Sequence, residues 1–385
     1  MKDLKAVFLY SPEWDEVKYP QDCPFDTGRA GKTRNTIRSM GLLGGSRNKE
    51  IEPVIATRAE LEKFHDPAYL DAIKNAEKGE LPPEAFAMGI GTPDCPVFRG
   101  MYDYFSLASG ASLTGARLIL SGEANVAFNP AGGFHHAGPG SASGFCFIND
   151  VVLAAVELSA AGKRVLFLDL DVHHGDGVEK AFYERNDVLT ISMHESGKTL
   201  FPGTGAEADT GSGAGKGYAV NIPLPVGTYD AAYERAFRRG ALPLIFKFNP
   251  DVIILELGMD ALSGDPLAHL NLTNNAYVGI IKEILKLEKP ILATGGGGYN
   301  VEATVRGWAL VWSILCGEDD HDMGIGMGGV FLETSEWLGG LRDRVLITDA
   351  GIRDTVDAEI ERVIRVIEDN VFPIHGCSPT RAGSL

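Results

Sequence analysis

One segment of the sequence gathers acidic and imidazole side chains at the end of an apolar run. Residues 165–177 read VLFLDLDVHHGDG, and their polar members are Asp169, Asp171, His173, His174 and Asp176. Alternation along an extended chain places Asp169, Asp171 and His173 on one side. Carboxylate and imidazole ligands together suit a divalent metal of borderline softness, such as Zn²⁺. Three Asp and two His within eight residues therefore predict a metal site rather than helix caps.

A second apolar run supplies a third ligand. A catalytic zinc ion needs three protein ligands and one open position for water. The run VIILELGMD ends in Asp260. Asp265 competes for the role, but it precedes a proline in a turn, where a structural role fits better. We expect Asp171, His173 and Asp260 to bind the metal, without cysteine, because no Cys lies near either motif.

Two adjacent histidines, His135 and His136, lie in the glycine-rich segment GGFHHAGPG. Such a loop is poor core material, so the pair predicts proton transfer, one ring serving as general base and the other as acid. Their basicities must differ for this purpose. A buried carboxylate behind each ring would make the two basicities differ, and Asp169 and Asp176 are free for that role.

A tyrosine follows four glycines in the segment ILATGGGGYN. Glycines let the backbone approach a site closely. Beside a metal, the phenol of Tyr299 can donate a hydrogen bond to a developing oxyanion. We expect Tyr299 to be this electrophilic group.

Alternating strands and helices must position these residues. We expect buried strands at Ala6–Tyr10, Asn125–Phe128, Val165–Leu170, Val188–Ser192, Val252–Leu257 and Ile291–Thr294. We expect helices at Met101–Leu120, Asp150–Ala161, Tyr229–Phe248, Ala276–Leu287, Val301–Leu315 and Asp354–Val371, and a capping box at Thr57 and Glu60. This order predicts an α/β fold with one mostly parallel sheet and helices on both faces. The site should lie at the carboxyl ends of the strands.

Length and composition set the remaining expectations. We expect one catalytic domain over residues 1–376, and a polar, flexible tail over 377–385. The net charge of −17 argues against direct binding of nucleic acid and is compatible with cationic substrates. Five dispersed cysteines indicate free thiols in a reducing compartment. With neither a signal peptide nor a membrane-spanning run evident, we expect a cytoplasmic protein.

Together the motifs resemble the zinc-dependent histone deacetylase superfamily. That group includes class I lysine deacetylases, bacterial acetoin-utilisation deacetylases and acetylpolyamine amidohydrolases. The resemblance covers almost the whole chain through the segments GGFHHAGPGSASGFCFIND, DLDVHHGDGVEKAF, FPGTG, ELGMDALSGDPL and GGGGYN. It implies an arginase/deacetylase-like fold and deacylation of acyl-lysine in proteins or peptides.

The resemblance also implies roles for individual residues. His136, assisted by Asp176, would be the general base, and His135, backed by Asp169, the acid or electrostatic partner. A substrate channel would be formed by Asp94, Gly144, Phe145, Phe201 and Leu267, and Arg29 would lie on a product-exit path. Structural K⁺ or Na⁺ is implied as well, and Fe²⁺ is an alternative to Zn²⁺.

Departures and alternatives concern the substrate. The amino-terminal loop reads QDCPFDTGRAGKT where the family usually has a His-Pro element, and Leu200 stands where an aromatic residue is frequent. An acetylated polyamine or another small acetylated amine is therefore an alternative substrate. An arginase-like ureohydrolase with two metals and a non-catalytic acyl-lysine binder also remain open. The sequence does not determine the oligomeric state.

Overall fold

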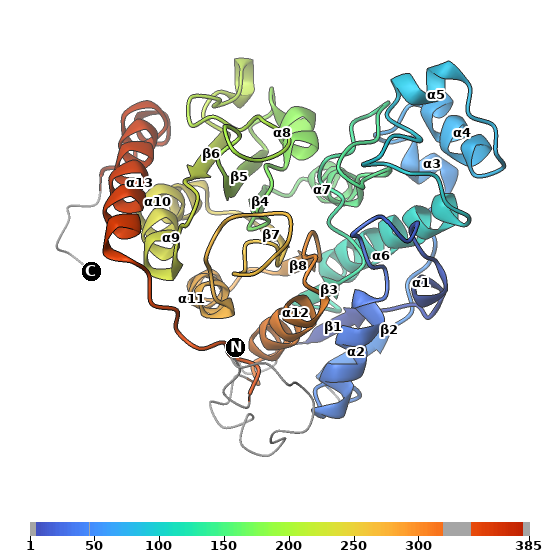
Figure 1. Cartoon of the computed structure of the whole chain (residues 1–385), viewed down its shortest axis with the longest axis horizontal. Coiled ribbons are helices and arrows are strands. Elements are labelled where there is room, and N and C mark those ends of the chain that lie inside the picture. The colour runs from blue at the N-terminus through green and yellow to red at the C-terminus, as the bar shows by residue number, and fades with distance from the viewer. Residues whose placement is uncertain (1–4, 46, 319–339, 380–385) are drawn as a thin grey trace.

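Eight strands form one fully parallel sheet in the order β2-β1-β3-β8-β7-β4-β5-β6 (Figure 1). The computed structural model describes residues 5–45, 47–318 and 340–379. The strands are β1 Ala6–Leu9, β2 Asn48–Ile51, β3 Val126–Asn129, β4 Val165–Asp169, β5 Val188–Glu195, β6 Ala219–Leu224, β7 Val252–Glu256 and β8 Ile291–Thr294. All six strands that the sequence predicts are present, and the sheet confirms the α/β prediction. The expected tail falls mostly outside the described residues.

The two strands that the sequence analysis missed, β2 and β6, lie at the edges of the sheet. Strand β2 reads NKEI and exposes its central residues. Strand β6 reads AVNIPL and contains Pro223, which cannot donate a hydrogen bond to a neighbour. An edge strand needs partners on one side only, so both sequences are tolerated there without the apolar run of a central strand.

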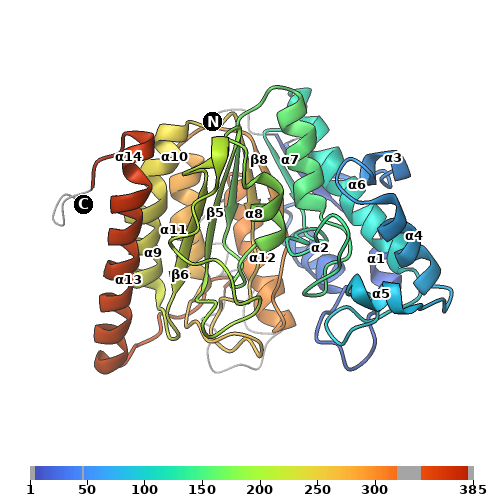
Figure 2. The ribbon, with the colours of Figure 1, turned by 90° about the horizontal axis from the view of Figure 1, so that it is seen from above.

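Helices cover both faces of the sheet. In Figure 1, α6, α7 and α8 lie on one side of the row of strands, and α2, α12, α11, α9 and α10 on the other, with α13 outside β6. The main helices are α2 Arg29–Ser39, α6 Met101–Leu120, α7 Asp150–Ala160, α8 Asp176–Phe182, α9 Asp230–Ala236, α10 Leu242–Phe248, α11 Asn274–Leu285, α12 Val301–Leu315 and α13 Ala350–Asn370. Shorter helices are α1 Glu13–Glu16, α3 Arg58–Leu61, α4 Pro67–Ala76, α5 Pro83–Ala87 and α14 Phe372–His375. Figure 2 shows the same layers from above.

Local sequence explains where helices begin and where one is irregular. The capping box of Thr57 and Glu60 starts α3, as the sequence predicts. The single helix predicted over 229–248 is instead α9 and α10 joined by a π-helical turn, Phe237–Ala241. Pro243 in the first turn of α10 has no N–H for a regular hydrogen bond, and the wider turn accommodates it.

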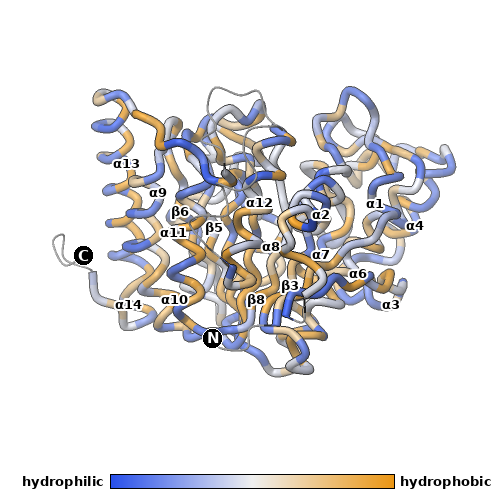
Figure 3. Tube along the Cα trace, turned by 90° about the horizontal axis from the view of Figure 1, so that it is seen from below, coloured by the Kyte–Doolittle hydropathy of each residue, from blue (hydrophilic) through white to orange (hydrophobic). Residues whose placement is uncertain are grey.

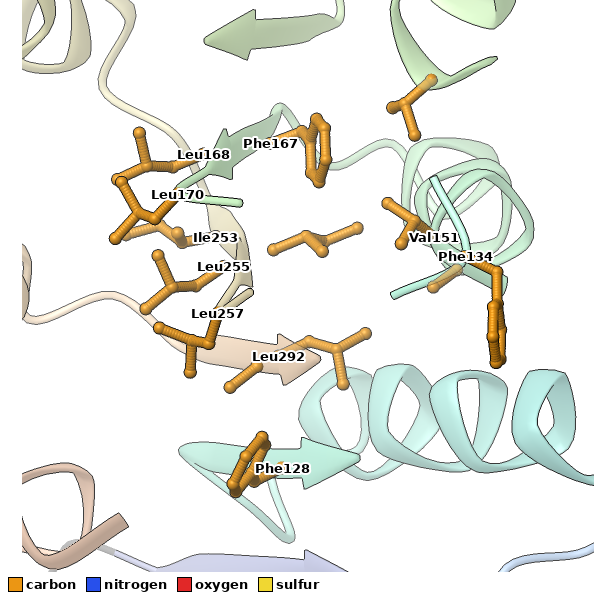
Figure 4. Close-up of a cluster of buried hydrophobic side chains, with 14 of the residues drawn as sticks. Phe128, Phe134, Val151, Phe167, Leu168, Leu170, Ile253, Leu255, Leu257 and Leu292 are labelled. Atoms are coloured by element: carbon orange, nitrogen blue, oxygen red, sulfur yellow. The ribbon is translucent and has the colours of Figure 1, made fainter. Parts of the chain in front are cut away.

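The core lies between the sheet and its helices. Figure 4 shows Phe167 pointing from β4 toward Phe134 and Val151, whereas Leu168 points to the opposite face. Figure 3 shows apolar residues concentrated on the strands and on the inner sides of the helices. Burial of each such side chain stabilises the fold by roughly 1.5–3 kcal/mol, which makes the sheet a rigid support for the loops at its end. Among the described helices, none combines the length and apolar character needed to cross a bilayer.

Candidate active site

Four loops meet at the carboxyl ends of adjacent central strands, β3, β8, β7 and β4. They carry, in the order of the strands, the histidine pair, the glycine-rich segment with Tyr299, Asp260, and the Asp171–His173 segment. Segments that are far apart in the sequence are neighbours because their strands are neighbours. The site therefore lies where the sequence analysis places it.

Asp171, His173 and Asp260 form a buried group with the geometry of a metal site. The Nδ1 atom of His173 lies 3.1 Å from Asp171 Oδ1 and 3.0 Å from Asp260 Oδ2. The three potential ligand atoms all lie within 4.8 Å of one another. Backbone N–H groups hold the carboxylates, because Gly297 donates to Asp171 and Val172 to Asp260.

The charges of this group favour a bound cation. Burial alone would lower the pKa of His173, but its hydrogen bonds with Asp171 and Asp260 outweigh burial and raise the pKa to about 10. Burial and the charge of Asp171 raise the pKa of Asp260 to about 7. Two carboxylates thus compete for one counter-charge, and a divalent ion would neutralise both. A Cβ atom at Gly297 would lie 1.9 Å from Asp260, so only glycine fits there.

The histidine pair is held by two separate carboxylates. His135 Nδ1 lies 3.0 Å from Asp169 Oδ2, and His136 Nδ1 lies 2.9 Å from Asp176 Oδ1. The Nε2 atoms of the two rings are 3.0 Å apart. The structure therefore brings together both predicted His–Asp pairs.

Different surroundings separate the basicities of the two rings. Burial lowers the pKa of His136, the positive charge of His135 adds to this effect, and the pKa falls to about 3. Burial would also lower the pKa of His135, but the charges of Glu256 and Asp169 outweigh it and raise that pKa well above its usual range. His136 thus favours the neutral form and His135 the protonated form.

Residues that the sequence analysis left unassigned fix the histidine loop. Asp150, at the start of α7, accepts hydrogen bonds from the backbone N–H groups of Gly133 and Phe134. The neighbouring Asn149 side chain donates to the carbonyls of His135 and Ala137. Both residues lie in the quoted motif segment, but only the fold shows which atoms they hold.

Tyr299 lies at the site, on the loop after β8. Its ring centroid is 6.4 Å from that of His173 and 5.7 Å from that of Phe145. Asp265 accepts a hydrogen bond of 2.7 Å from the Tyr299 backbone N–H and also binds the N–H of Leu267. Asp265 therefore has the structural position that the sequence analysis favours.

Arg29 is buried beneath the glycine-rich loop. Its guanidinium donates to the carbonyls of Gly298 at 2.8 Å and Gly296 at 3.0 Å. It also lies over the rings of Phe25 and Trp308. These contacts fix Arg29 against the carbonyl groups of the glycine-rich loop, and its partner Phe25 lies 6.1 Å from the ring of Phe145.

Several of the expected channel residues lie beside the histidines and Tyr299. The Phe201 ring is 43% exposed and lies 5.1 Å from the ring of His136. A Cβ atom at Gly144 would lie 2.5 Å from His136 and 2.9 Å from Phe201, so a wider side chain would close this space. Asp94 accepts a hydrogen bond from the Gly144 N–H, and its carbonyl accepts one from Phe145. Leu267 is half-buried on the loop that carries Asp265.

Glu256 is a fully buried carboxylate that the sequence analysis missed. Its Oε1 atom lies 3.0 Å from His135 Nδ1. It pairs in register with Asp169 on the neighbouring strand. A single Glu within the apolar strand VIILE was the signal that could have identified it, because a charge in a central strand needs a reason.

Comparison with known proteins identifies similar chains. A family model described as "Histone deacetylase domain" matches residues 23–315. The "Acetoin utilization protein AcuC" of Bacillus subtilis is 40% identical over 326 residues, covering 82% of this chain and 83% of its own length. "Histone deacetylase 8" of Xenopus tropicalis is 37% identical, covering 82% of this chain and 85% of its own.

A solved structure agrees with these sequence matches. The crystal structure of an HDAC homolog complexed with SAHA superposes with a TM-score of 0.81 at 30% identity. The match covers 95% of this chain and 99% of the other. Architecture and sequence therefore point to the same group of proteins.

Proposed function

The chain belongs to the histone deacetylase family, and we propose that it hydrolyses Nε-acyl-lysine in proteins or peptides with one Zn²⁺ ion. As a member of this family it is a hydrolytic deacetylase, so the non-catalytic binder is the wrong alternative. We further propose one catalytic domain over residues 1–376, and a cytoplasmic location on the basis of the five free thiols.

The proposal is supported chiefly by how close the metal-binding group lies to the histidine pair. The buried Asp171–His173–Asp260 group can hold a metal, and the His135–His136 pair lies beside it. The Nε2 atom of His135 is 4.0 Å from Asp171 Oδ1. Proton transfer and metal binding are thus close enough to act on one bond.

The ligand atoms fit Zn²⁺. Two carboxylates and one imidazole are ligands that zinc accepts, and three protein ligands leave one position open. The two carboxylates carry more negative charge than His173 alone neutralises. When bound, the metal would polarise the acyl carbonyl and lower the pKa of a water molecule. Fe²⁺ would accept the same ligands, and K⁺ or Na⁺ would be additional structural ions.

The protein's own residues would move the protons. His136 Nδ1 lies 2.9 Å from Asp176 Oδ1, so Nε2, which also faces His135, would be the atom that accepts a proton from the attacking water. The water oxygen bonds to the acyl carbon, and the C–N bond breaks. His135, kept protonated by its carboxylates, gives a proton to the leaving amine nitrogen. Burial raises the pKa of Tyr299 well above its usual range, so its hydroxyl stays a donor to the oxyanion.

The channel supports an acyl-lysine substrate. Phe145 and Phe201 offer aromatic faces to the lysine methylenes, and Gly144 leaves space between Phe201 and His136. Asp94, which binds the backbone of Gly144 and Phe145, and Leu267 would meet the substrate backbone. Arg29 would border the path by which the free acid leaves.

A second candidate substrate is an acetylated polyamine or another small acetylated amine. The acidic balance of the chain, at −17, suits a cationic substrate of either kind. The deciding experiment measures hydrolysis of an acetyl-lysine peptide beside acetylated polyamines, with and without chelator, on metal-quantified protein. Chelator-sensitive peptide turnover at about one zinc per chain supports the proposal. Turnover of polyamines alone would show that a small acetylated amine, and not an acyl-lysine peptide, is the substrate.

A further inference from the structure

Glu256 is a carboxylate at the site to which the sequence analysis gives no role. It lies on β7, is 0% exposed, and faces Thr294 on one neighbouring strand and Asp169 on the other. Among the described residues, neither of its carboxylate oxygens has a hydrogen-bond donor in good geometry. A buried carboxylate in this state costs stability, so its presence needs a functional reason.

The close polar neighbour of Glu256 is the Nδ1 atom of His135. Glu256 Oε1 and Asp169 Oδ2 each lie 3.0 Å from that one nitrogen. Only the contact with Asp169 has the direction of a hydrogen bond, since the Nδ1–H group points at Asp169. The second carboxylate lies beside the N–H group rather than in line with it.

Asp169 also has a contact with the metal-binding segment. Its Oδ1 atom accepts the backbone N–H of Asp171, so the orientation of Asp169 is tied to the metal-binding segment. Glu256 belongs to a different strand, β7, which lies beside β4. Two carboxylates from two strands therefore flank one edge of the His135 ring, while its other edge faces His136.

We propose that Glu256 is a positioning residue that acts through His135. With Asp169 it holds Nδ1 and so directs Nε2 of His135 toward His136 and the reacting bond. This inference rests on the proposed deacetylase function. Burial and the nearby carboxylates raise the pKa of Glu256 well above its usual range, which agrees with a costly group kept for its position.

Two variants of Glu256 separate positioning from a structural role. Glu256→Leu keeps the approximate size and removes both oxygens, whereas Glu256→Gln keeps an oxygen near Nδ1. We expect Glu256→Leu to lower kcat about tenfold or more with KM and zinc content unchanged, and Glu256→Gln to remain within about threefold of the wild type. We expect the melting temperature to stay equal or rise in both, because an unsatisfied buried carboxylate is removed.

A matched control comes from the neighbouring strand. Thr294 is buried in register with Glu256, and its hydroxyl also lacks a partner among the described residues. Thr294→Val should leave kcat unchanged. A similar loss of kcat in Thr294→Val and Glu256→Leu would overturn the proposal. Any change of packing at these paired strand positions would then be enough to lower kcat.

A readout without substrate makes the test independent of the activity assay. Ring ¹⁵N signals of His135, assigned with a His135→Asn variant, should shift in Glu256→Leu and return toward wild-type values in Glu256→Gln. Unchanged signals and unchanged kcat in Glu256→Leu would overturn the proposal. A second metal equivalent that is lost in Glu256→Leu would also overturn it, because His135, Asp169 and Glu256 would then be a metal site. If the wild type turns over no acyl substrate, the proposed function fails while the His135 signals still test the positioning.

Discussion

The Nε2 atoms of His135 and His136 lie 3.0 Å apart, although each ring is bound through Nδ1 to its own carboxylate. Consecutive residues thus present two imidazoles to each other with opposite tendencies to hold a proton. Burial lowers the pKa of His136 to about 3, while the surrounding carboxylates raise that of His135. In the proposed mechanism this contact would join the base and the acid.

Removing the base should stop turnover without removing the metal. We expect His136→Ala to lower kcat by about 10²-fold to 10⁴-fold, because no other group accepts the proton of water. Zinc content should equal that of the wild type. Lys180→Met is the matched control: its ammonium binds Asp176 Oδ2, but the side chain is 67% exposed, so kcat should change little. An active His136→Ala variant would contradict the assignment.

Tyr299 should act on the transition state. We expect Tyr299→Phe to lower kcat by about 10²-fold to 10³-fold with zinc content intact, since a single oxyanion donor is lost. Tyr218→Phe serves as the control, because that ring packs on Phe248 and His375, away from the site. Loss of zinc from Tyr299→Phe would show that the residue supports the metal instead.

The narrow space at Gly144 should control access to the histidines. Gly144→Ala would place a methyl group against His136 and Phe201, and we expect kcat/KM to fall about 10²-fold. Gly162→Ala is the matched control. Gly162 also has a positive φ, of 76°, but an added Cβ atom there would meet open space. That variant should lose only about 1–2 kcal/mol of stability. Equal kinetic losses in both would contradict the role of Gly144.

Acid should destabilise the protein through His65. This ring accepts the N–H of Asn149, and burial lowers its pKa from 6.5 to about 4. Between these values the unfolded chain binds the proton more readily, so stability from this residue is present above pH 6.5 and is lost as the pH falls toward 4. The loss is on the order of 3 kcal/mol.

Thermal melts across this pH range test the effect of His65. The melting temperature of the wild type should fall from pH 6.5 to 4, and His65→Gln should show a flatter profile because Gln does not titrate. Parallel profiles for the two proteins would show that other groups dominate acid unfolding.

Much of the fold was open to prediction from sequence. The six central strands are short apolar runs bounded by polar residues, and burial on both faces requires that composition. The edge strands β2 and β6 were not predicted, because a strand with one free side tolerates the polar residues of NKEI and the proline of AVNIPL. The π-helical turn before Pro243 was not predicted, because it depends on how two helices join.

The sequence by itself indicated the candidate chemical residues, because acids and histidines that follow apolar strands have few structural uses. Tertiary structure decided how they combine. Strand order β3-β8-β7-β4 brings His136, Asp171, Asp260 and Tyr299 to one edge of the sheet, and no local pattern encodes that order. It also decided that Glu256 faces His135, because the register between β4 and β7 places Glu256 beside Asp169. Spacing along the chain fixes local geometry, whereas contacts between strands depend on the packing of the whole sheet.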